Sequence, residues 1–230
     1  MRLRILGCSG GIGGGNHTSA FLLDDSVLID AGTGVSLLAF EELLHIEHVF
    51  LSHAHFDHIA SLPTLLDTVN GRPGHTITVH ASAATIADLR EHIFNWRIWP
   101  DFSQIPTPEN ARLRFAPLET GETHEAAGCR ITALPAVHAV PAQAFQLDSG
   151  QASVIYSGDS TGGDAFWAAV NATENLAALI IETAFPDREA ALAQIAIAAV
   201  AGEAGIGNGT QAGAIGVFQA QLAQRLDVTD

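Results

Sequence analysis

The stretch His53-Ala54-His55-Phe56-Asp57-His58 decides how this sequence is interpreted, because it places four potential metal ligands within six positions. In an extended chain His53 and His55 face one point, while Asp57 and His58 can turn toward a second point nearby. Imidazole and carboxylate groups bind zinc, iron or manganese, and two such ions can hold the attacking and leaving oxygens of a displacement reaction. The motif therefore predicts two adjacent divalent-metal sites. A chance cluster of hydrogen-bonded histidines explains this density of ligands less well.

The surrounding pattern of strands and helices places this motif on a loop. Residues 48–52 are typical of a strand, and an apolar helical stretch follows from Ile59 to about Val69. Further helices are predicted over residues 35–44, over residues 82–94 with Ser82 as the cap, and from about Pro186. Other strands are predicted at residues 2–6, 20–23, 27–29, 76–80, 113–115, 130–134, 143–147, 152–156 and 177–181. Strands with helices thus occur twice, which favours one layered α/β domain whose two β-rich halves face each other.

Composition and charge narrow the classes of function. The 230 residues are 47% hydrophobic and 15% charged, which suits one domain with a buried core. A formal charge of −15, with ten cations that are all arginine, disfavours long nucleic acids as partners. The lack of lysine excludes a Schiff-base lysine and a Walker-type phosphate loop. Two distant cysteines, Cys8 and Cys129, and the lack of an apolar run of about 18 residues predict a cytoplasmic protein without a membrane span.

Three further residues complete a resemblance to a known family. His138 lies in Leu134-Pro135-Ala136-Val137-His138-Ala139-Val140-Pro141, and Asp159 lies in Tyr156-Ser157-Gly158-Asp159-Ser160. Asp30 ends its predicted strand shortly before Gly32. His138 and Asp159 resemble later motifs of the metallo-β-lactamase superfamily, and Asp30 resembles its first motif. The resemblance implies an α/β fold, a four-layer αββα sandwich.

The resemblance also implies a role for each site residue. One ion would be bound by His53, His55 and His138, and the other by Asp57 and His58. Asp159 and a hydroxide would bridge the two ions, the hydroxide would be the nucleophile, and Asp57 would orient it as the catalytic residue. Asp30 would support the site by hydrogen bonding without binding metal.

The C-terminal part departs from the family pattern. The family's final metal-binding histidine follows the last strand, yet no histidine occurs after His138. The second ion is therefore expected to be under-occupied unless water, a carboxylate, His17 or a histidine of a partner chain fills the vacancy. Residues 1–190 are predicted as the metallo-β-lactamase-type domain, incomplete at its C-terminal end, and residues 191–230 as a divergent segment. One hypothesis is that a frameshift or rearrangement replaced the native C-terminus after about Ala190.

The segments that flank the metal motifs suggest a narrower group. Residues 6–11, 93–102 and 180–185 resemble bacterial cyclic-nucleotide phosphodiesterase-like proteins. The resemblance implies a metal-dependent hydrolase that opens a small cyclic phosphodiester, with two divalent ions, zinc or else iron or manganese. A tRNA 3′-end endonuclease or another hydrolase of this fold is the alternative. From a different class, the chain could be a catalytically impaired metal- or ligand-binding protein. The assembly could be a homodimer.

Two more predictions concern residues around the metal site. Trp96 and Trp99, together with Phe94 and Phe102, are candidates for a lid that stacks a nucleobase, although aromatic residues at such spacing also fill cores. Glu182 ends a buried strand and would hydrogen-bond a ligating histidine, or else be an ordinary strand-end carboxylate.

Overall fold

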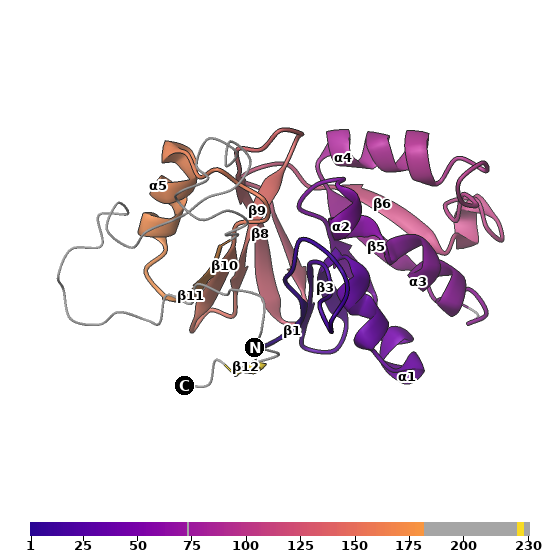
Figure 1. Ribbon diagram of the computed structural model, residues 1–230, viewed down its shortest axis with the longest axis horizontal. Helices are drawn as coiled ribbons and strands as arrows, with labels where there is room; N and C mark the ends of the chain where they lie inside the picture. Colours follow the sequence, from indigo (N-terminus) through magenta and orange to yellow (C-terminus); the bar gives the residue numbers. More distant parts are fainter. Residues whose placement is uncertain (73, 182–224, 228–230) are drawn as a thin grey trace.

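Two β-sheets lie face to face, and helices cover the outer face of each (Figure 1). The computed structural model describes residues 1–72, 74–181 and 225–227. The first sheet has the order β12–β1–β2–β3–β4–β5–β6, and the second has the order β11–β10–β9–β8–β7. The strands are β1 (Arg2–Gly7), β2 (Ala20–Leu23), β3 (Val27–Ala31), β4 (His48–Phe50), β5 (Ile77–Ala81), β6 (Leu113–Pro117), β7 (Thr123–Ala126), β8 (Cys129–Pro135), β9 (Gln143–Asp148), β10 (Ser153–Tyr156), β11 (Leu176–Ile180) and β12 (Arg225–Asp227).

The described helices are short. They are η1 (Thr33–Leu37), α1 (Phe40–Leu43), α2 (Phe56–Ile59), α3 (Leu62–Val69), α4 (Ala83–Asp88), the π-helix η2 (Leu89–Ile93), η3 (Pro108–Asn110) and α5 (Asp164–Ala172). In Figure 1, α1 to α4 lie on the first sheet and α5 lies on the second. None of the helices in the described ranges has the length and apolar character needed to cross a lipid bilayer.

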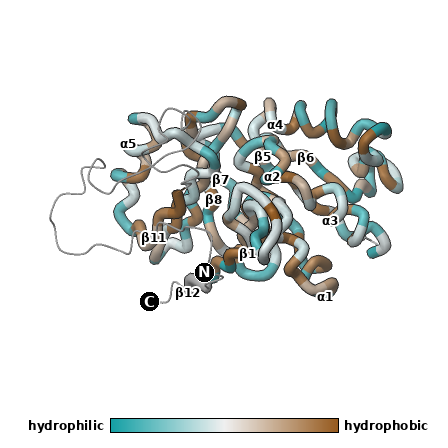
Figure 2. The backbone as a smooth tube through the Cα atoms, viewed as in Figure 1, coloured by the Kyte–Doolittle hydropathy of each residue, from teal (hydrophilic) through white to brown (hydrophobic). Residues whose placement is uncertain are grey.

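Alternating side chains build three layers of core. Along β3, Val27 and Ile29 point into the cluster between the two sheets, whereas Leu28 points into the cluster beneath α3 and α4. On the second sheet, Phe145 of β9 enters the cluster between the sheets and Ala144 enters the cluster beneath α5. Figure 2 shows the matching pattern on the helices, where hydrophilic and hydrophobic bands alternate along α4 and η2. The predicted four-layer αββα sandwich is thereby confirmed.

The strand directions bring the predicted site together at one edge of the sheets. Strands β3, β4, β5 and β6 run parallel, and Ile29 of β3 lies beside Phe50 of β4. Because parallel strands end on the same side of a sheet, Asp30 lies next to the segment that follows β4. Strand β10 ends at Tyr156, so Asp159 follows from the opposite sheet.

One predicted helix is wrong, and four elements, β7, α5, η3 and β12, were not predicted. Instead of one helix over residues 35–44, η1 and α1 are separated by Leu38, whose backbone is extended (φ −77°, ψ 137°) and whose side chain is buried in the core. The carboxylate of Glu42 accepts a hydrogen bond from the Ala39 N–H at 2.8 Å, which starts the new helix. Strand β7 was missed because three of its four residues are polar and only one is buried, and α5 was also missed.

Elsewhere the local predictions agree with the structure. The Ser82 hydroxyl caps α4 by accepting a hydrogen bond from the Thr85 N–H at 3.1 Å, as predicted. The strands predicted at residues 2–6, 20–23, 27–29, 130–134 and 143–147 are present with bounds shifted by two residues at most. Glu182, the helix expected near Pro186 and the segment over residues 191–230 lie outside the described residues, except for β12.

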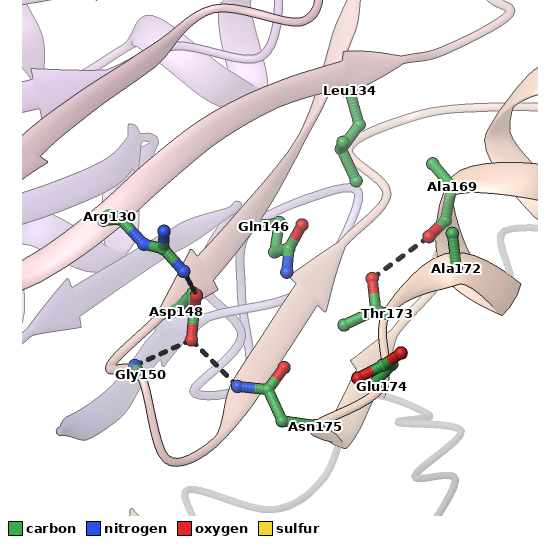
Figure 3. Close-up of a pocket in the computed structure, with 10 residues that line it drawn as sticks. All are labelled: Arg130, Leu134, Gln146, Asp148, Gly150, Ala169, Ala172, Thr173, Glu174 and Asn175. Atoms are coloured by element: carbon green, nitrogen blue, oxygen red, sulfur yellow. Dashed lines mark hydrogen bonds and ion pairs between the residues drawn. The ribbon is translucent and has the colours of Figure 1, made fainter.

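A buried carboxylate fastens the end of the second sheet that lies around the β9–β10 turn (Figure 3). Asp148, at the end of β9, accepts hydrogen bonds from Asn175 Nδ2 at 2.9 Å and from the Gly150 N–H at 2.7 Å, and it pairs with Arg130 of β8. Burial alone would raise the pKa of Asp148, but the hydrogen bonds from Arg130, Asn175 and Gly150 lower it to about 2. The carboxylate therefore joins β8, β9 and the approach to β11.

Candidate metal centre

The histidine-rich motif changes from extended to helical conformation in the middle of its sequence. It begins after β4, and His55 is the extended residue (φ −64°, ψ 147°) that precedes α2. Asp57 and His58 lie within α2, and the His58 N–H donates to the His55 carbonyl at 3.0 Å. The predicted strand-to-helix loop is present, and the change of conformation aims the two halves of the motif at neighbouring points.

The first group of potential ligands consists of His53, His55, His138 and Asp159. One ligand atom of each lies within 4.8 Å of those of the others. His138 Nε2 lies 3.0 Å from His55 Nδ1, and His53 Nε2 lies 3.7 Å from Asp159 Oδ2. His138 Nε2 is 3.9 Å from the same carboxylate oxygen. Residues from the motif, from the β8–β9 connection and from the loop after β10 therefore converge on one point.

The second group consists of Asp57, His58 and Asp159. His58 Nε2 lies 3.0 Å from Asp159 Oδ1 and 3.6 Å from Asp57 Oδ2. Asp159 thus presents Oδ1 to this group and Oδ2 to the first. A carboxylate shared in this way is arranged as a bridge between two adjacent ions.

The environment of His53 Nε2, which faces the first group, suits a bound metal ion. His53 is fully buried, and its Nε2 atom has no hydrogen-bond partner among the described residues. A buried polar atom left without a partner costs about 1–3 kcal/mol. An imidazole lone pair directed at other nitrogen and oxygen donors is the chemistry of a zinc, iron or manganese ligand. The residues present therefore suit a divalent ion.

A buried carboxylate behind the two groups orients both inner histidines. Asp30 is fully buried, and its Oδ2 lies 2.7 Å from His58 Nδ1 and accepts a hydrogen bond from the Ser52 hydroxyl at 2.8 Å. Since the Ser52 hydroxyl proton goes to Asp30, its oxygen accepts from His53 Nδ1 at 3.0 Å. With protons held on both Nδ1 atoms, the Nε2 atoms face the two groups.

Two further donors to Asp30 were not foreseen from the sequence. The Ser52 N–H donates to Asp30 Oδ1 at 2.8 Å, and the Tyr156 hydroxyl donates to Oδ2 at 2.8 Å. Ser52 directly precedes the metal motif and Tyr156 ends a buried strand, but neither position carries a sequence pattern that names its partner. The backbone of Asp30 itself has a positive φ of 56°, a conformation that Asp tolerates better than most residues.

The charges of the site are distributed unequally between the histidines. Burial lowers the pKa of His53 to about 3, and the neighbouring His58 lowers it further in the same direction. Burial also lowers the pKa of His138. For His58 burial acts in the same sense, but the Asp30 and Asp159 carboxylates overcome it and raise the pKa well above its ordinary value. Without metal, the proton of the site therefore resides on His58, between two carboxylates.

Glycines allow the loops around the centre to approach each other closely. A Cβ atom on Gly32 would lie 2.2 Å from the Asp57 carbonyl oxygen, which real Cβ atoms do not tolerate. Gly158 has a positive φ of 57°, and a Cβ there would lie 3.0 Å from the Ser52 Cβ. Gly32 thus lets the loop after β3 approach Asp57, and Gly158 lets the turn before Asp159 approach Ser52. These close approaches bring residues from the two sheets together at the centre.

Two cavities flank the centre. The smaller, of about 240 Å³, is bordered by His55 and has a mostly apolar lining that includes Phe56, Ile59, Leu89 and Ile93. The larger, of about 750 Å³, is bordered by His138 and opens toward Ser82, Glu119 and Thr120. Val140 lines both cavities, so the β8–β9 connection separates them.

Several predicted residues lie apart from the two ligand groups. Phe94 and Phe102 are buried in the core beneath the helices, and Trp99 packs partly against that core. Trp96 is 63% exposed and, like Trp99, is not among the residues that line the two cavities. His17 is half-buried in the glycine-rich loop and is not part of a ligand group in the described ranges.

Comparison with known proteins agrees with this geometry. The model of the family described as "Beta-lactamase superfamily domain" matches residues 25–226. The chain is 28% identical over 177 residues to "Probable metallo-hydrolase YhfI" of Bacillus subtilis, which covers 72% of this chain and 66% of the relative. It is 32% identical over 126 residues to "Probable 3',5'-cyclic-nucleotide phosphodiesterase" of Yersinia pestis, which covers 43% of this chain and 35% of the relative.

An RNA-cleaving relative also matches. The chain is 29% identical over 167 residues to "Endoribonuclease ysh-1" of Neurospora crassa, which covers 64% of this chain and 20% of the relative. The aligned part thus spans less than two thirds of each of these relatives. The crystal structure of YhfI superposes with a TM-score of 0.64 at 24% identity and covers 80% of this chain and 71% of that one, which shows a shared fold.

Proposed function

The chain belongs to the β-lactamase superfamily, and from that premise we propose that this metallo-β-lactamase-fold hydrolase is a phosphodiesterase that acts on a cyclic nucleotide. The observation that carries the proposal is the position of Asp159, which presents one carboxylate oxygen to each of two adjacent ligand groups. Two ions held side by side suit a displacement at phosphorus, where both the attacking and the leaving oxygen need stabilisation.

Each residue has a separate task in this proposal. His53, His55 and His138 would hold one divalent ion, Asp57 and His58 the other, and Asp159 both. Bound there, zinc ions would make a water molecule acidic enough to attack near neutral pH and would offset charge on the phosphate oxygens.

Asp57 is the residue we assign to orienting the attacking water. Its side chain is 33% exposed, so it reaches the solvent side of the centre, whereas His58 beside it is buried. Asp30 and Ser52 would keep the ligating nitrogens aimed at the ions by holding the histidine protons on the far side of each ring.

The surroundings of the centre favour a small substrate. The apolar cavity beside His55 offers a surface of the kind that receives a flat ring such as a nucleobase. A net charge of −15 would repel a long RNA backbone. We therefore favour a cyclic nucleotide over the RNA substrate suggested by the name of the Neurospora relative.

The second ion is the weak point of this proposal. The sequence has no histidine after His138, and the described residues offer Asp57, His58 and Asp159 to that ion. Three side chains and a water can complete a four-coordinate zinc site. We propose that the second ion binds more weakly than the first. A chain that binds one ion and has no turnover would instead be an impaired binding protein.

The test combines metal content with turnover. Elemental mass spectrometry would give the zinc per chain, and 3′,5′-cyclic AMP and a tRNA precursor would be offered as substrates in parallel. We expect hydrolysis of the cyclic nucleotide and its loss, together with bound zinc, in Asp159→Asn. Asp148→Asn is the matched control, because it removes a buried carboxylate charge from the same sheet away from the centre. Cleavage of the tRNA precursor alone, or cyclic-nucleotide turnover that persists in Asp159→Asn, would contradict the proposal.

A further inference from the structure

Three histidines that take no part in the metal centre meet between the two sheets, where β7 of the second sheet faces β4 and β5 of the first. They are His48 at the start of β4, His80 in β5 and His124 in β7. A ring nitrogen of each lies within 4.8 Å of those of the other two. The ring centroids are 5.2 Å apart for His48 and His80, 5.4 Å for His48 and His124, and 4.2 Å for His80 and His124. Three imidazoles thus surround one point.

The alternation of the strands explains this meeting. His48 and Phe50 share the face of β4 that looks toward the other sheet, and His80 lies beside Phe50 on the neighbouring parallel strand. On β7, Ala126 packs in the core between the sheets, so His124, two residues earlier, points to the same side. The Phe50 ring stacks on His80 at 4.4 Å with an interplanar angle of 10° and closes the cluster on its inner side.

The cluster is electrostatically suited to a cation only if its imidazoles are neutral. His80 is 2% exposed, and burial, with the neighbouring His124 and His48, lowers the pKa of His80 to about 3. Burial, and then His124, also lowers the pKa of His48, although the adjacent Glu47 acts in the opposite sense. His48 Nδ1 and His80 Nε2 lie 2.9 Å apart, so both nitrogens already face the same point between the rings. Neutral imidazoles are the form that ligates transition metals.

We propose that His48, His80 and His124 form an additional metal site, which binds one Zn²⁺ ion and clamps the two sheets together. Zinc–nitrogen distances of about 2.0–2.1 Å in a tetrahedral site place ligand nitrogens about 3.3 Å apart. His48 Nδ1 and His80 Nε2 already lie 2.9 Å apart, and the His124 nitrogen lies within 4.8 Å of a nitrogen of each. Rotation of the His124 ring would bring the three nitrogens close to this geometry. His48 and His124 are half-buried, which leaves the fourth position open to water. Three nitrogen ligands select zinc, copper or nickel over magnesium and calcium.

This site is separate from the metal centre. His48 and His53 are five positions apart and flank the buried Phe50, and five residues of extended chain span up to about 16 Å. An ion bound by His48, His80 and His124 would not share a ligand with the centre around Asp159. It would instead connect β4 and β5 of the first sheet to β7, the edge strand of the second.

The test separates the two kinds of site by removing each in turn. In a chain that carries His53→Ala, His55→Ala and Asp159→Asn, which removes ligands from both groups of the metal centre, we expect one Co²⁺ per chain, detected by its visible d–d absorption, and a thermal unfolding temperature that rises on cobalt addition. Adding His124→Ala should abolish both signals. His45→Ala is the matched control, because it removes an exposed histidine near the same strand and should leave both signals intact.

A second measurement keeps the metal centre intact. After equilibration with Zn²⁺ and dialysis, elemental mass spectrometry should find one zinc fewer per chain in His124→Ala than in His45→Ala. This measurement tests the additional site even if the chain without His53 and His55 does not fold. Equal zinc contents in the two single variants would overturn the proposal, as would the absence of bound Co²⁺ in a folded chain that carries His53→Ala, His55→Ala and Asp159→Asn.

Discussion

Replacing Asp30 by asparagine tests the support of the metal centre most directly. The carboxylate receives four hydrogen-bonding groups, the Ser52 N–H and hydroxyl, His58 Nδ1 and the Tyr156 hydroxyl. An asparagine keeps one acceptor oxygen and turns an NH2 group toward groups that are donors themselves. Breaking a buried ion pair costs about 3–5 kcal/mol, but the two hydroxyls can rotate to new partners. We expect the metal-free protein to lose about 3 kcal/mol of unfolding free energy, measured by urea denaturation.

The same substitution should weaken binding of the second ion. An NH2 group opposite His58 Nδ1 turns that atom into an acceptor, so the ring proton moves to Nε2, the atom that faces Asp57 and Asp159. Loss of such a supporting hydrogen bond typically lowers metal affinity about 10–100-fold. We expect this decrease for the second ion in a Co²⁺ titration, while the ion held by His53 and its partners is retained.

A matched control separates this effect from lost stability. Asp148→Asn also removes a buried carboxylate that receives several hydrogen bonds, but it does so in the hairpins of the second sheet. We expect it to destabilise the chain without changing metal binding. Undiminished affinity for both ions in a folded Asp30→Asn chain would refute the role assigned to Asp30. Equal losses of affinity in the two variants would attribute the effect to stability alone.

Three further predictions concern stability. Tyr156→Phe removes one hydrogen bond to a buried carboxylate and should cost about 1.5 kcal/mol by urea denaturation, and no loss would argue against that bond. The pKa of Asp148, about 2 against an ordinary 3.8, implies about 1 kcal/mol of stability above pH 4 that disappears as the pH falls toward 2, so wild type and Asp148→Asn should converge there. Gly32→Ala should cost about 3 kcal/mol or more in thermal unfolding because its Cβ would meet the Asp57 carbonyl, whereas Gly71→Ala, with open space around it, should be nearly neutral.

The fold could be predicted largely because its signals are local. The histidine motif lies between a strand and a helix in the sequence, and the structure keeps it at that junction. Strands β2, β3 and β10 are buried on both faces, so they are largely hydrophobic and easily recognised. Where the signal was weaker the prediction failed. The helix expected over residues 35–44 ignored the competing preference of Leu38 for an extended backbone that buries its side chain.

The residues that the sequence did not reveal depend on contacts between distant strands. Tyr156 reaches Asp30 across 126 positions of sequence, from the opposite sheet. His48, His80 and His124 lie on three strands of two sheets, and each one alone resembles an ordinary strand residue. Local periodicity shows which face of a strand a side chain occupies, but only the pairing of the sheets shows which faces meet.

The proton on His58 bears on the order in which two ions would bind to the centre. His58 lies between Asp30 at 2.7 Å and Asp159 at 3.0 Å, and these carboxylates raise its pKa despite its burial. An ion at the second group must displace this proton, whereas burial already keeps His53 and His138 neutral for the first ion. The group that needs deprotonation is also the group for which the sequence supplies no final histidine. Both features would weaken a second ion under the proposed function, and its affinity should rise as the pH increases through the pKa of His58.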